Sequence, residues 1–258
     1  MDIRSHNRAA WDILSRSGDR WGIPVEPSTI AAARRGKWSV VLTNSAPVPR
    51  AWFPASLVGL DILGLASAGG QQGPIFAAAG ARVTVLDNSP EQLARDAFVA
   101  KRDKLDIRLV EGTMEDLSAF ANESFDLVFN PASVFFTRDV RAVWREAARV
   151  LRPGGTLLSG FLNPAVYLFE KDAVDGGPPL LVTFKLPYSD ERDLPKEELA
   201  ARVARREPLG FSHTLTDLLG GQMDAGLQLV SMYEDVFGDA ALDAHMPGLL
   251  ATRAVKPS

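Results

Sequence analysis

The chain has 258 residues, of which 46% are hydrophobic and 23% charged, a composition typical of an ordinary globular protein with one large domain. Its formal net charge of −4 gives no reason to expect a broad cationic surface, which argues against a nucleic-acid partner. The absence of cysteine excludes thiolate catalysis, disulfides and cysteine-based metal sites, and we expect no metal centre. No apolar run approaches the length of a membrane span, and the N-terminus lacks the apolar stretch of a signal peptide. A cytoplasmic location without a membrane partner is therefore expected.

The first 54 residues are predicted to lie outside the main sheet. Ala10, Ile13 and Leu14 recur at helical spacing and predict a short amphipathic helix over residues 6–17. A stretch punctuated by proline and glycine follows, and it contains Trp21 and two further tryptophans. These rings either cover one edge of a sheet or frame a ligand pocket, and the sequence favours neither interpretation.

From residue 55 onward, short apolar runs alternate with helix-length segments. The predicted strands are Asp61–Leu65, Arg82–Asp87, Ile107–Glu111, Phe125–Phe129 and Thr156–Phe161, and the predicted helices are Gln72–Ala79, Pro90–Lys104 and Val140–Leu151. The second helix has the clearest start, with Ser89 as N-cap and Pro90 at the first helical position. Strands that alternate with helices predict a parallel sheet with right-handed crossovers.

The alternation stops after the fifth predicted strand. The remaining predicted elements are the extended segment Leu180–Pro187, the helices Lys196–Glu207 and Thr214–Ala225, and the strands Gln228–Glu234 and Gly248–Val255. We therefore divide the chain into an N-terminal segment (1–54), a core (55–163), an insertion (164–210) and a C-terminal part of the core sheet (211–258). An insertion at the carboxyl edge of a sheet is suited to cover a ligand.

One part of the core predicts a nucleoside-binding site. The apolar run Leu60–Leu65 enters a turn of small residues, Ala66–Gly70, and after a helix the next apolar run ends at Asp87. Small residues let backbone N–H groups approach a ligand, and a carboxylate after the second strand can accept the hydroxyl protons of a ribose. The alternative for Asp87 is a solvated loop acid. The arrangement favours the ribose role.

Three longer stretches narrow the choice of cofactor. Gly80–Leu93 (GARVTVLDNSPEQL), Gly112–Pro131 and Trp144–Leu158 resemble the class I S-adenosylmethionine-dependent methyltransferases. The resemblance is strongest to small-molecule enzymes with a GGQQ-type loop, matched here by Gly69–Gln72. It implies an α/β fold with a doubly wound, mostly parallel seven-stranded sheet of Rossmann-like type, ending in an antiparallel C-terminal hairpin. It also implies S-adenosylmethionine as cofactor and in-line transfer of its methyl group.

The loop after the first strand departs from the usual family pattern. Ala66 and Ala68 stand where the family has glycines, so either the loop keeps to negative φ or Gly69 and Gly70 carry the bend. Gly64 stands where an acid often ends the first strand, which removes the usual partner of the methionine ammonium. We hypothesise that Gln71 and Gln72, next in the chain, replace it as neutral acceptors.

The resemblance assigns cofactor-binding roles to residues at the carboxyl ends of the first four strands. Met114 is suited to an adenine face, because its thioether is flexible and polarisable, although a core-filling role is nearly as well supported. Adenine N–H recognition is expected from Glu115 or a backbone carbonyl. The complete predicted set is Gly64, Ala66, Ser67, Gly70, Gln71, Gln72, Asp87, Asn88, Thr113, Met114, Glu115 and Asn130.

Candidate bases and acceptor contacts are few. His213 and Tyr188 are the candidate catalytic residues, although Ser212–Thr214 also resembles a helix N-cap, which gives His213 a structural alternative. Many methyltransferases need no dedicated base. The predicted acceptor-binding residues are Trp11, Trp21, Phe135, Tyr167 and Tyr188, which favour a small hydrophobic or aromatic acceptor, with an indole-like ring as one option.

Two other functions are compatible with parts of the pattern. A nicotinamide-dependent oxidoreductase would need a phosphate-cradling GxGxxG motif, and Ala66–Gln71 does not fit its register. A non-catalytic cofactor-binding protein is suggested by the altered loop. The sequence does not determine the oligomeric state, and a homodimer is among the expected assemblies.

Overall fold

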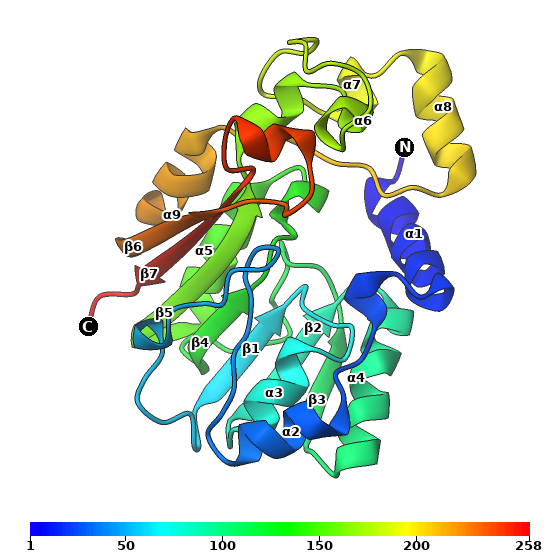
Figure 1. The fold of residues 1–258 in the computed structure, drawn as a ribbon. Helices are drawn as coiled ribbons and strands as arrows, with labels where there is room; N and C mark the ends of the chain where they lie inside the picture. Colours follow the sequence, from blue (N-terminus) through cyan, green and yellow to red (C-terminus); the bar gives the residue numbers. More distant parts are fainter.

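The computed structural model describes residues 1–258 and contains one seven-stranded sheet between two layers of helices (Figure 1). The strands are β1 Asp61–Leu65, β2 Arg82–Asp87, β3 Ile107–Glu111, β4 Phe125–Asn130, β5 Leu151–Leu162, β6 Gln228–Asp235 and β7 Leu249–Val255. They are ordered β3-β2-β1-β4-β5-β7-β6. The first five run parallel, and β7 is antiparallel to both β5 and β6. The predicted sheet with its antiparallel C-terminal hairpin is confirmed.

Helices and short helical turns connect these strands. In chain order they are α1 Ile3–Ser17, η1 Arg20–Gly22, α2 Pro27–Arg34, η2 Arg50–Trp52, α3 Gln72–Ala78, α4 Pro90–Asp103, η3 Val134–Phe136, α5 Val140–Val150, η4 Pro164–Leu168, α6 Lys171–Val174, α7 Asp190–Asp193, α8 Lys196–Arg205, η5 Thr216–Gly220, α9 Gly221–Asp224 and η6 Ala241–Ala244. None of them combines the length and the apolar composition needed to cross a membrane.

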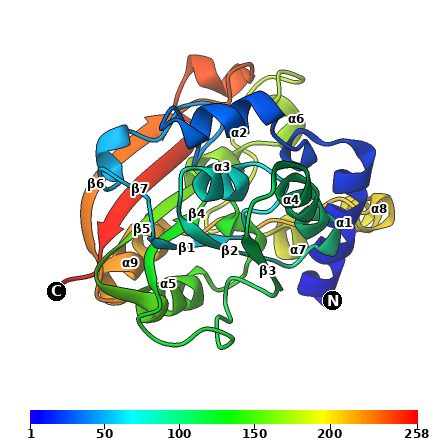
Figure 2. The same ribbon diagram turned by 90° about the horizontal axis from the view of Figure 1, so that it is seen from below.

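Alternation along the strands builds a core on each face of the sheet. Ile62 of β1 joins a cluster that includes residues of α2, α3 and α4, whereas the next residue, Leu63, joins a cluster that includes residues of α5. Figure 2 shows the two layers, with α2, α3 and α4 on one side of the sheet and α5 and α9 on the other. Trp144 of α5 is completely buried in the second cluster. The two cores fix the strands whose carboxyl ends meet at one edge.

Several predicted boundaries need correction. The first helix begins at Ile3, because the Asp2 side chain accepts a hydrogen bond from the Ser5 N–H and caps it. β5 begins five residues earlier than predicted, at Leu151. The helix predicted over Thr214–Ala225 is instead a turn of π-helix followed by the four-residue α9. The segment predicted to be extended, Leu180–Pro187, contains no β-strand.

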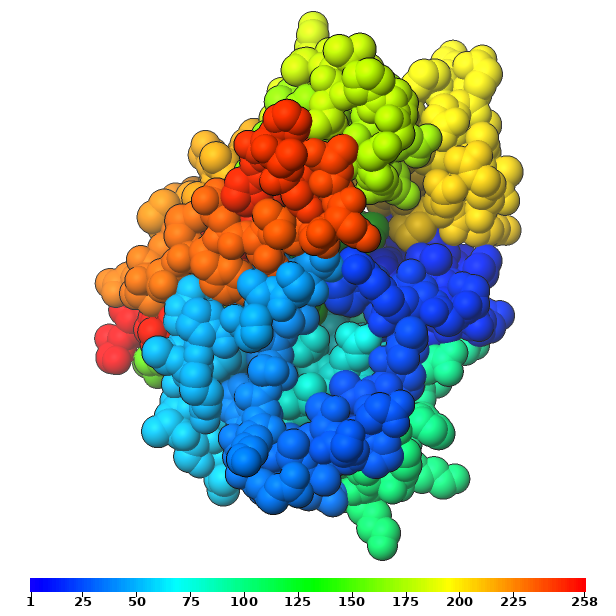
Figure 3. Space-filling view, viewed as in Figure 1, coloured from blue at the N-terminus to red at the C-terminus, as the bar shows by residue number.

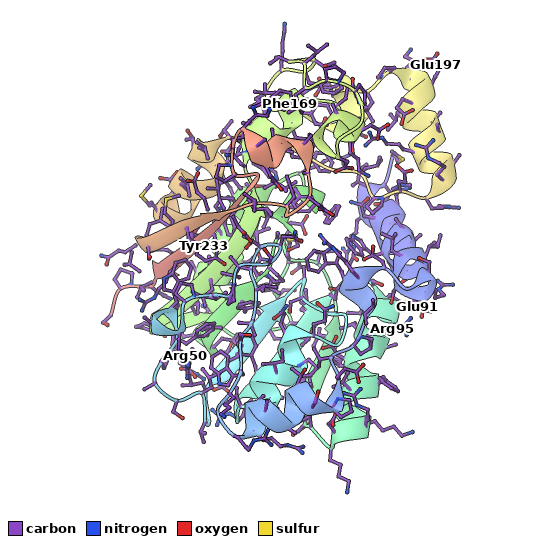
Figure 4. All side chains as sticks on the ribbon, in the orientation of Figure 1. Arg50, Glu91, Arg95, Phe169, Glu197 and Tyr233 are labelled. Carbon is purple, nitrogen blue, oxygen red and sulfur yellow. The ribbon has the colours of Figure 1, made fainter.

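The N-terminal segment and the insertion meet above the sheet. In Figure 3 the insertion (yellow-green to yellow) lies at the top of the molecule, and the N-terminal segment (blue) crosses the front. The Asn7 side chain donates to the Leu209 carbonyl at 2.9 Å and accepts from the Leu209 N–H at 2.8 Å. Arg95 of α4, labelled in Figure 4, donates to the Ser15 carbonyl at 2.6 Å. These contacts hold α1 against both α4 and the end of the insertion.

Candidate functional site

A cavity of about 300 Å³ lies at the carboxyl ends of the parallel strands. Residues that follow β1, β2, β3 and β4 line it, together with Leu162 at the end of β5. The N-terminal segment forms a further wall through α1 and η1. This is the edge at which open α/β sheets bind ligands, because loops from several strands converge there.

The loop between β1 and α3, residues Ala66–Gln71, which we call the cofactor loop, forms the floor of this cavity. Gly69 and Gly70 adopt φ of 117° and 74°. These glycines therefore carry the bend, which was one of the two alternatives expected from the sequence. The expectation of negative φ is wrong at Ala66, where φ is 47°. A side chain at Gly69 would collide with the Trp21 carbonyl oxygen, which explains why glycine is needed there.

Asp87 lines the cavity from the end of β2 and also holds the cofactor loop. Its Oδ2 accepts a hydrogen bond from the Ala68 N–H at 3.2 Å, and its Oδ1 accepts from the Ser89 N–H at 3.0 Å. Burial, with a smaller contribution from the nearby Asp12 carboxylate, raises the pKa of Asp87 to about 6, against the lowering effect of these hydrogen bonds. The predicted position of Asp87 beside the loop is therefore what the structure shows.

A second carboxylate beneath the loop was not predicted. Asp96 lies in α4, is fully buried, and its Oδ2 accepts from the N–H groups of Gly69 (2.8 Å) and Gly70 (3.0 Å). Burial raises its pKa to about 7, with Asp87 adding to the shift. The sequence contained one indication, because Asp96 is spaced three residues from Leu93 and from Val99 on the apolar side of α4.

These contacts bear on the oxidoreductase alternative. A dinucleotide site uses the free N–H groups of its glycine-rich loop to bind pyrophosphate. Here the N–H groups of Ala68, Gly69 and Gly70 already donate to carboxylates. The loop therefore favours a ligand without a phosphate at this point.

The missing acid of β1 has a local structural reason. A Cβ built on Gly64 would collide with the Ser67 Oγ, which is buried and has no hydrogen-bond partner. The loop's own serine thus occupies the space that any side chain at position 64 would need. Gly64 does not line the cavity, whereas Ser67 and Ala66 do.

Gln71 and Gln72 form hydrogen bonds with different parts of the N-terminal segment. Gln71 Nε2 donates to the carbonyls of Arg20 (2.8 Å) and Ile23 (3.1 Å), which ties the loop to the N-terminal segment. Gln72 Oε1 accepts from the Val41 N–H at 3.4 Å. Both residues line the cavity. Their role as acceptors for an ammonium group stays a prediction.

The other predicted cofactor residues divide by position. Asn88, Thr113, Met114 and Glu115 line the cavity, whereas Gly70 and Asn130 do not. The completely buried Asn130 amide donates to the Leu65 carbonyl and to Ser133 Oγ, both at 2.9 Å, and accepts from Ser159 Oγ at 3.0 Å. Asn130 therefore joins β1, β4 and β5 beneath the site.

Outside the cofactor loop, the cavity wall contains several apolar and aromatic side chains. Trp11, Trp21 and Phe135 of the predicted acceptor set line the cavity. Trp11 packs edge-on against Phe136, with 5.4 Å between ring centroids. The sequence did not indicate that Leu162, Phe237 and Leu249 also belong to this wall, because they come from the end of β5, the loop after β6 and the start of β7.

The insertion does not contribute to the cavity wall, which corrects the expected place of the acceptor pocket. Tyr167 and Tyr188 pack against each other at 5.3 Å between centroids. The buried Tyr188 hydroxyl donates to Asp190 Oδ1 at 2.8 Å, and burial raises the pKa of Tyr188. Neither tyrosine faces the cavity, so the structure does not place them as an acceptor contact or a base.

His213 also lies outside the cavity wall. Its Nε2 is 3.1 Å from the Val134 carbonyl oxygen, and burial lowers its pKa. The expected N-cap pattern is present one residue later, where the Thr214 hydroxyl accepts from the Asp217 N–H at 3.0 Å. The structure thus separates His213 from the residues that surround the cofactor loop. It also contains no group of three or more His, Asp or Glu side chains placed to hold a metal ion.

Fold and site together define an α/β protein with the sheet of the class I methyltransferases and a cavity at the carboxyl ends of its parallel strands. Residues 63–159 match the family described as the methyltransferase domain. The chain is 45% identical, over 98% of both chains, to the Bacillus subtilis protein named uncharacterized methyltransferase YbaJ. It therefore belongs to the S-adenosylmethionine-dependent methyltransferases, and the oxidoreductase alternative is wrong.

Two further similarities are more limited. A ubiquinone biosynthesis O-methyltransferase from Xanthomonas oryzae is 34% identical over 115 residues, which cover 43% of this chain and 47% of that protein. The crystal structure of an S-adenosylmethionine-dependent methyltransferase from Mesorhizobium loti superimposes with a TM-score of 0.60 at 22% identity. It covers 80% of this chain and 95% of its own, and at that identity it supports the fold alone.

Proposed function

We propose that the cavity binds S-adenosylmethionine on its cofactor-loop side and a small, apolar, aromatic acceptor on the opposite side. The observation that carries this proposal is that one cavity is lined both by small and polar residues, which we call the polar wall, and by aromatic residues of α1, η1 and η3. Ala66, Ser67 and Ala68 keep the first wall open, since none has a bulky side chain.

The polar wall fits this cofactor. Asp87 presents a carboxylate for the ribose hydroxyls, and Met114 offers an apolar surface for the adenine ring. Ser67 and Gln92 line the same wall, and each has a buried oxygen without a hydrogen-bond partner, which a polar ligand or ordered water can satisfy. When bound, S-adenosylmethionine supplies an electrophilic methyl group on a positively charged sulfur.

The titratable side chains of the cavity constrain the acceptor. Its wall contains the acids Asp87 and Glu115 and the arginines Arg4 and Arg20, but no histidine, tyrosine or lysine. Glu115 accepts a hydrogen bond from the Thr137 hydroxyl, so one of its carboxylate oxygens already has a partner. We therefore propose a nitrogen or carbon nucleophile that reacts when it is positioned and shielded from water, without a strong general base.

The experiment is a calorimetric titration followed by an acceptor screen. S-adenosylmethionine and its demethylated product should bind wild-type protein and bind Asp87→Ala at least about 10-fold more weakly, given about 1.5–3 kcal/mol for hydrogen bonds to a charged group. Glu111→Ala, at the end of the neighbouring strand and outside the cavity wall, is the control. Unchanged affinity in Asp87→Ala would refute the cofactor placement.

An acceptor screen follows the binding titration. It should find methyl transfer to indoles or aromatic amines in preference to phenols, and the reverse preference would refute the acceptor class.

A further inference from the structure

We propose that Asp96 is a positioning residue, which holds the cofactor loop in the shape that binds the cofactor. The inference rests on the proposed cofactor site, but Asp96 itself does not line the cavity. It acts through the backbone of Gly69 and Gly70. No motif of the sequence assigns it this role.

The contact is a buried carboxylate with two backbone donors. A single oxygen, Oδ2, accepts from both glycine N–H groups, at 2.8 and 3.0 Å. The other oxygen, Oδ1, is buried without a partner. A buried N–H group that loses its acceptor is destabilised, because neither the protein nor water then takes its hydrogen bond. The Gly69 N–H also lies 3.2 Å from the Gln92 carbonyl oxygen, so Asp96 is the nearer of two acceptors at Gly69 and the side-chain acceptor at Gly70.

The loop has little other freedom at this point. Gly70 is packed so closely that a Cβ would lie 2.9 Å from the Arg95 carbonyl oxygen and 3.0 Å from the Pro24 Cβ. Both glycines have positive φ, a conformation that needs support from its surroundings. The carboxylate supplies this support from the α4 side, while the N-terminal segment closes the other side.

Three consecutive N–H groups of the loop are directed to acids. The Ala68 N–H donates to Asp87, and those of Gly69 and Gly70 donate to Asp96. Because the Asp87 carboxylate also lines the cavity, a shift of the loop would change the placement of the proposed ribose acceptor. Loss of Asp96 should therefore weaken cofactor binding and not only lower stability.

The same loop also orders the acceptor side. The Gly70 carbonyl accepts from the Val25 N–H at 2.9 Å, and Gln71 holds the carbonyls of Arg20 and Ile23. Arg20 and Trp21, between these contacts, line the cavity. One buried carboxylate in α4 thus fixes the loop to which the N-terminal wall of the cavity is attached.

The test compares cofactor affinity with stability in three variants of the full chain. Asp96→Ala removes the acceptor, and Asp96→Asn keeps one carbonyl oxygen without the charge. Asp190→Asn is the matched control, because Asp190 is also buried and accepts from a backbone N–H, that of Gly210 at 2.7 Å, but lies in the insertion. Each is titrated calorimetrically with S-adenosylmethionine and with its demethylated product.

We expect Asp96→Ala to bind both compounds at least about 10-fold more weakly, Asp96→Asn to lie between it and wild type, and Asp190→Asn to stay within about twofold of wild type despite a lower Tm. A folded Asp96→Ala with wild-type affinity would overturn the inference. If Asp96→Ala does not fold, amide hydrogen exchange of Asp96→Asn tests the inference instead. Faster exchange at Gly69 and Gly70 than in wild type supports the inference, and equal exchange overturns it. Failure of Asp87→Ala to lose affinity refutes the cofactor site itself, so the two failures are distinguishable.

Discussion

The hydroxyl of Ser67 fills the space that a side chain at Gly64 would require. The two residues face each other where β1 enters the cofactor loop, and Val85 of β2 is the next nearest neighbour of the position, at 3.6 Å. Because the two positions share one space, substitutions at them should not be additive.

Gly64→Ala should lower the free energy of unfolding by about 1–3 kcal/mol, because it adds a methyl group to a closely packed site. The same change in a Ser67→Ala background should cost less, since the colliding Oγ atom has been removed. Chemical denaturation of the two single variants and the double variant measures the coupling between the positions. A strictly additive double variant would show that the hydroxyl is not the obstacle.

A second prediction concerns the junction between α1 and the insertion. Asn7→Ala removes the reciprocal hydrogen bonds with the Leu209 backbone, which are buried at 2.8 and 2.9 Å. It should lower the free energy of unfolding by about 1–3 kcal/mol, because the Leu209 N–H and carbonyl lose their partners. Limited proteolysis should then cleave faster near residues 1–17 and 196–207. Arg8→Ala, which removes an exposed ion pair with Glu111, is the control and should leave cleavage unchanged.

Tyr188 should behave as a structural residue. Tyr188→Phe keeps the ring packing against Tyr167 and Phe184 but removes the hydrogen bond to Asp190. We expect a loss of about 1 kcal/mol in the free energy of unfolding, with cofactor affinity as in wild type. A pH-dependent loss of methyl transfer with unchanged stability would instead restore Tyr188 as a candidate base.

Local patterns were sufficient to predict the sheet and most of its connections. The Ser89-Pro90 start fixed the beginning of α4, and the small residues before Gln71 marked the cofactor loop. Helix ends in the C-terminal part were less predictable, because the apolar spacing of Thr214–Ala225 does not distinguish a π-helical turn from a regular helix.

Site residues that directly follow a predicted strand could be placed from the sequence. Residues that reach the site through contacts between distant segments could not. Asp87 follows its strand directly, so its place at the sheet edge follows from topology. Phe237 and Leu249 join the cavity only because β7 pairs between β5 and β6 and brings the C-terminal loop across the edge. Tyr188 has the residue type of an acceptor contact, but its packing within the insertion depends on tertiary contacts that no local pattern encodes.

The two acids beneath the loop also predict how stability depends on pH. In the folded chain the pKa is about 6 for Asp87 and about 7 for Asp96, both above the ordinary value of 3.8. Between about pH 4 and 7 the folded state therefore holds more protons than the unfolded state. Stability from these groups is fully present at low pH and is lost as pH rises through the folded pKa values.

Asp96→Asn should remove the Asp96 part of this dependence, which reaches at most about 1.4 kcal/mol per pH unit for one group. Urea unfolding of the cofactor-free protein from pH 5 to 8 should show a flatter curve for the variant than for wild type. Asp193→Asn is the control, because the Arg192 guanidinium holds the pKa of Asp193 below its ordinary value and its contribution changes only at lower pH. Its curve should run parallel to that of wild type, and a parallel curve for Asp96→Asn would contradict the raised pKa of Asp96.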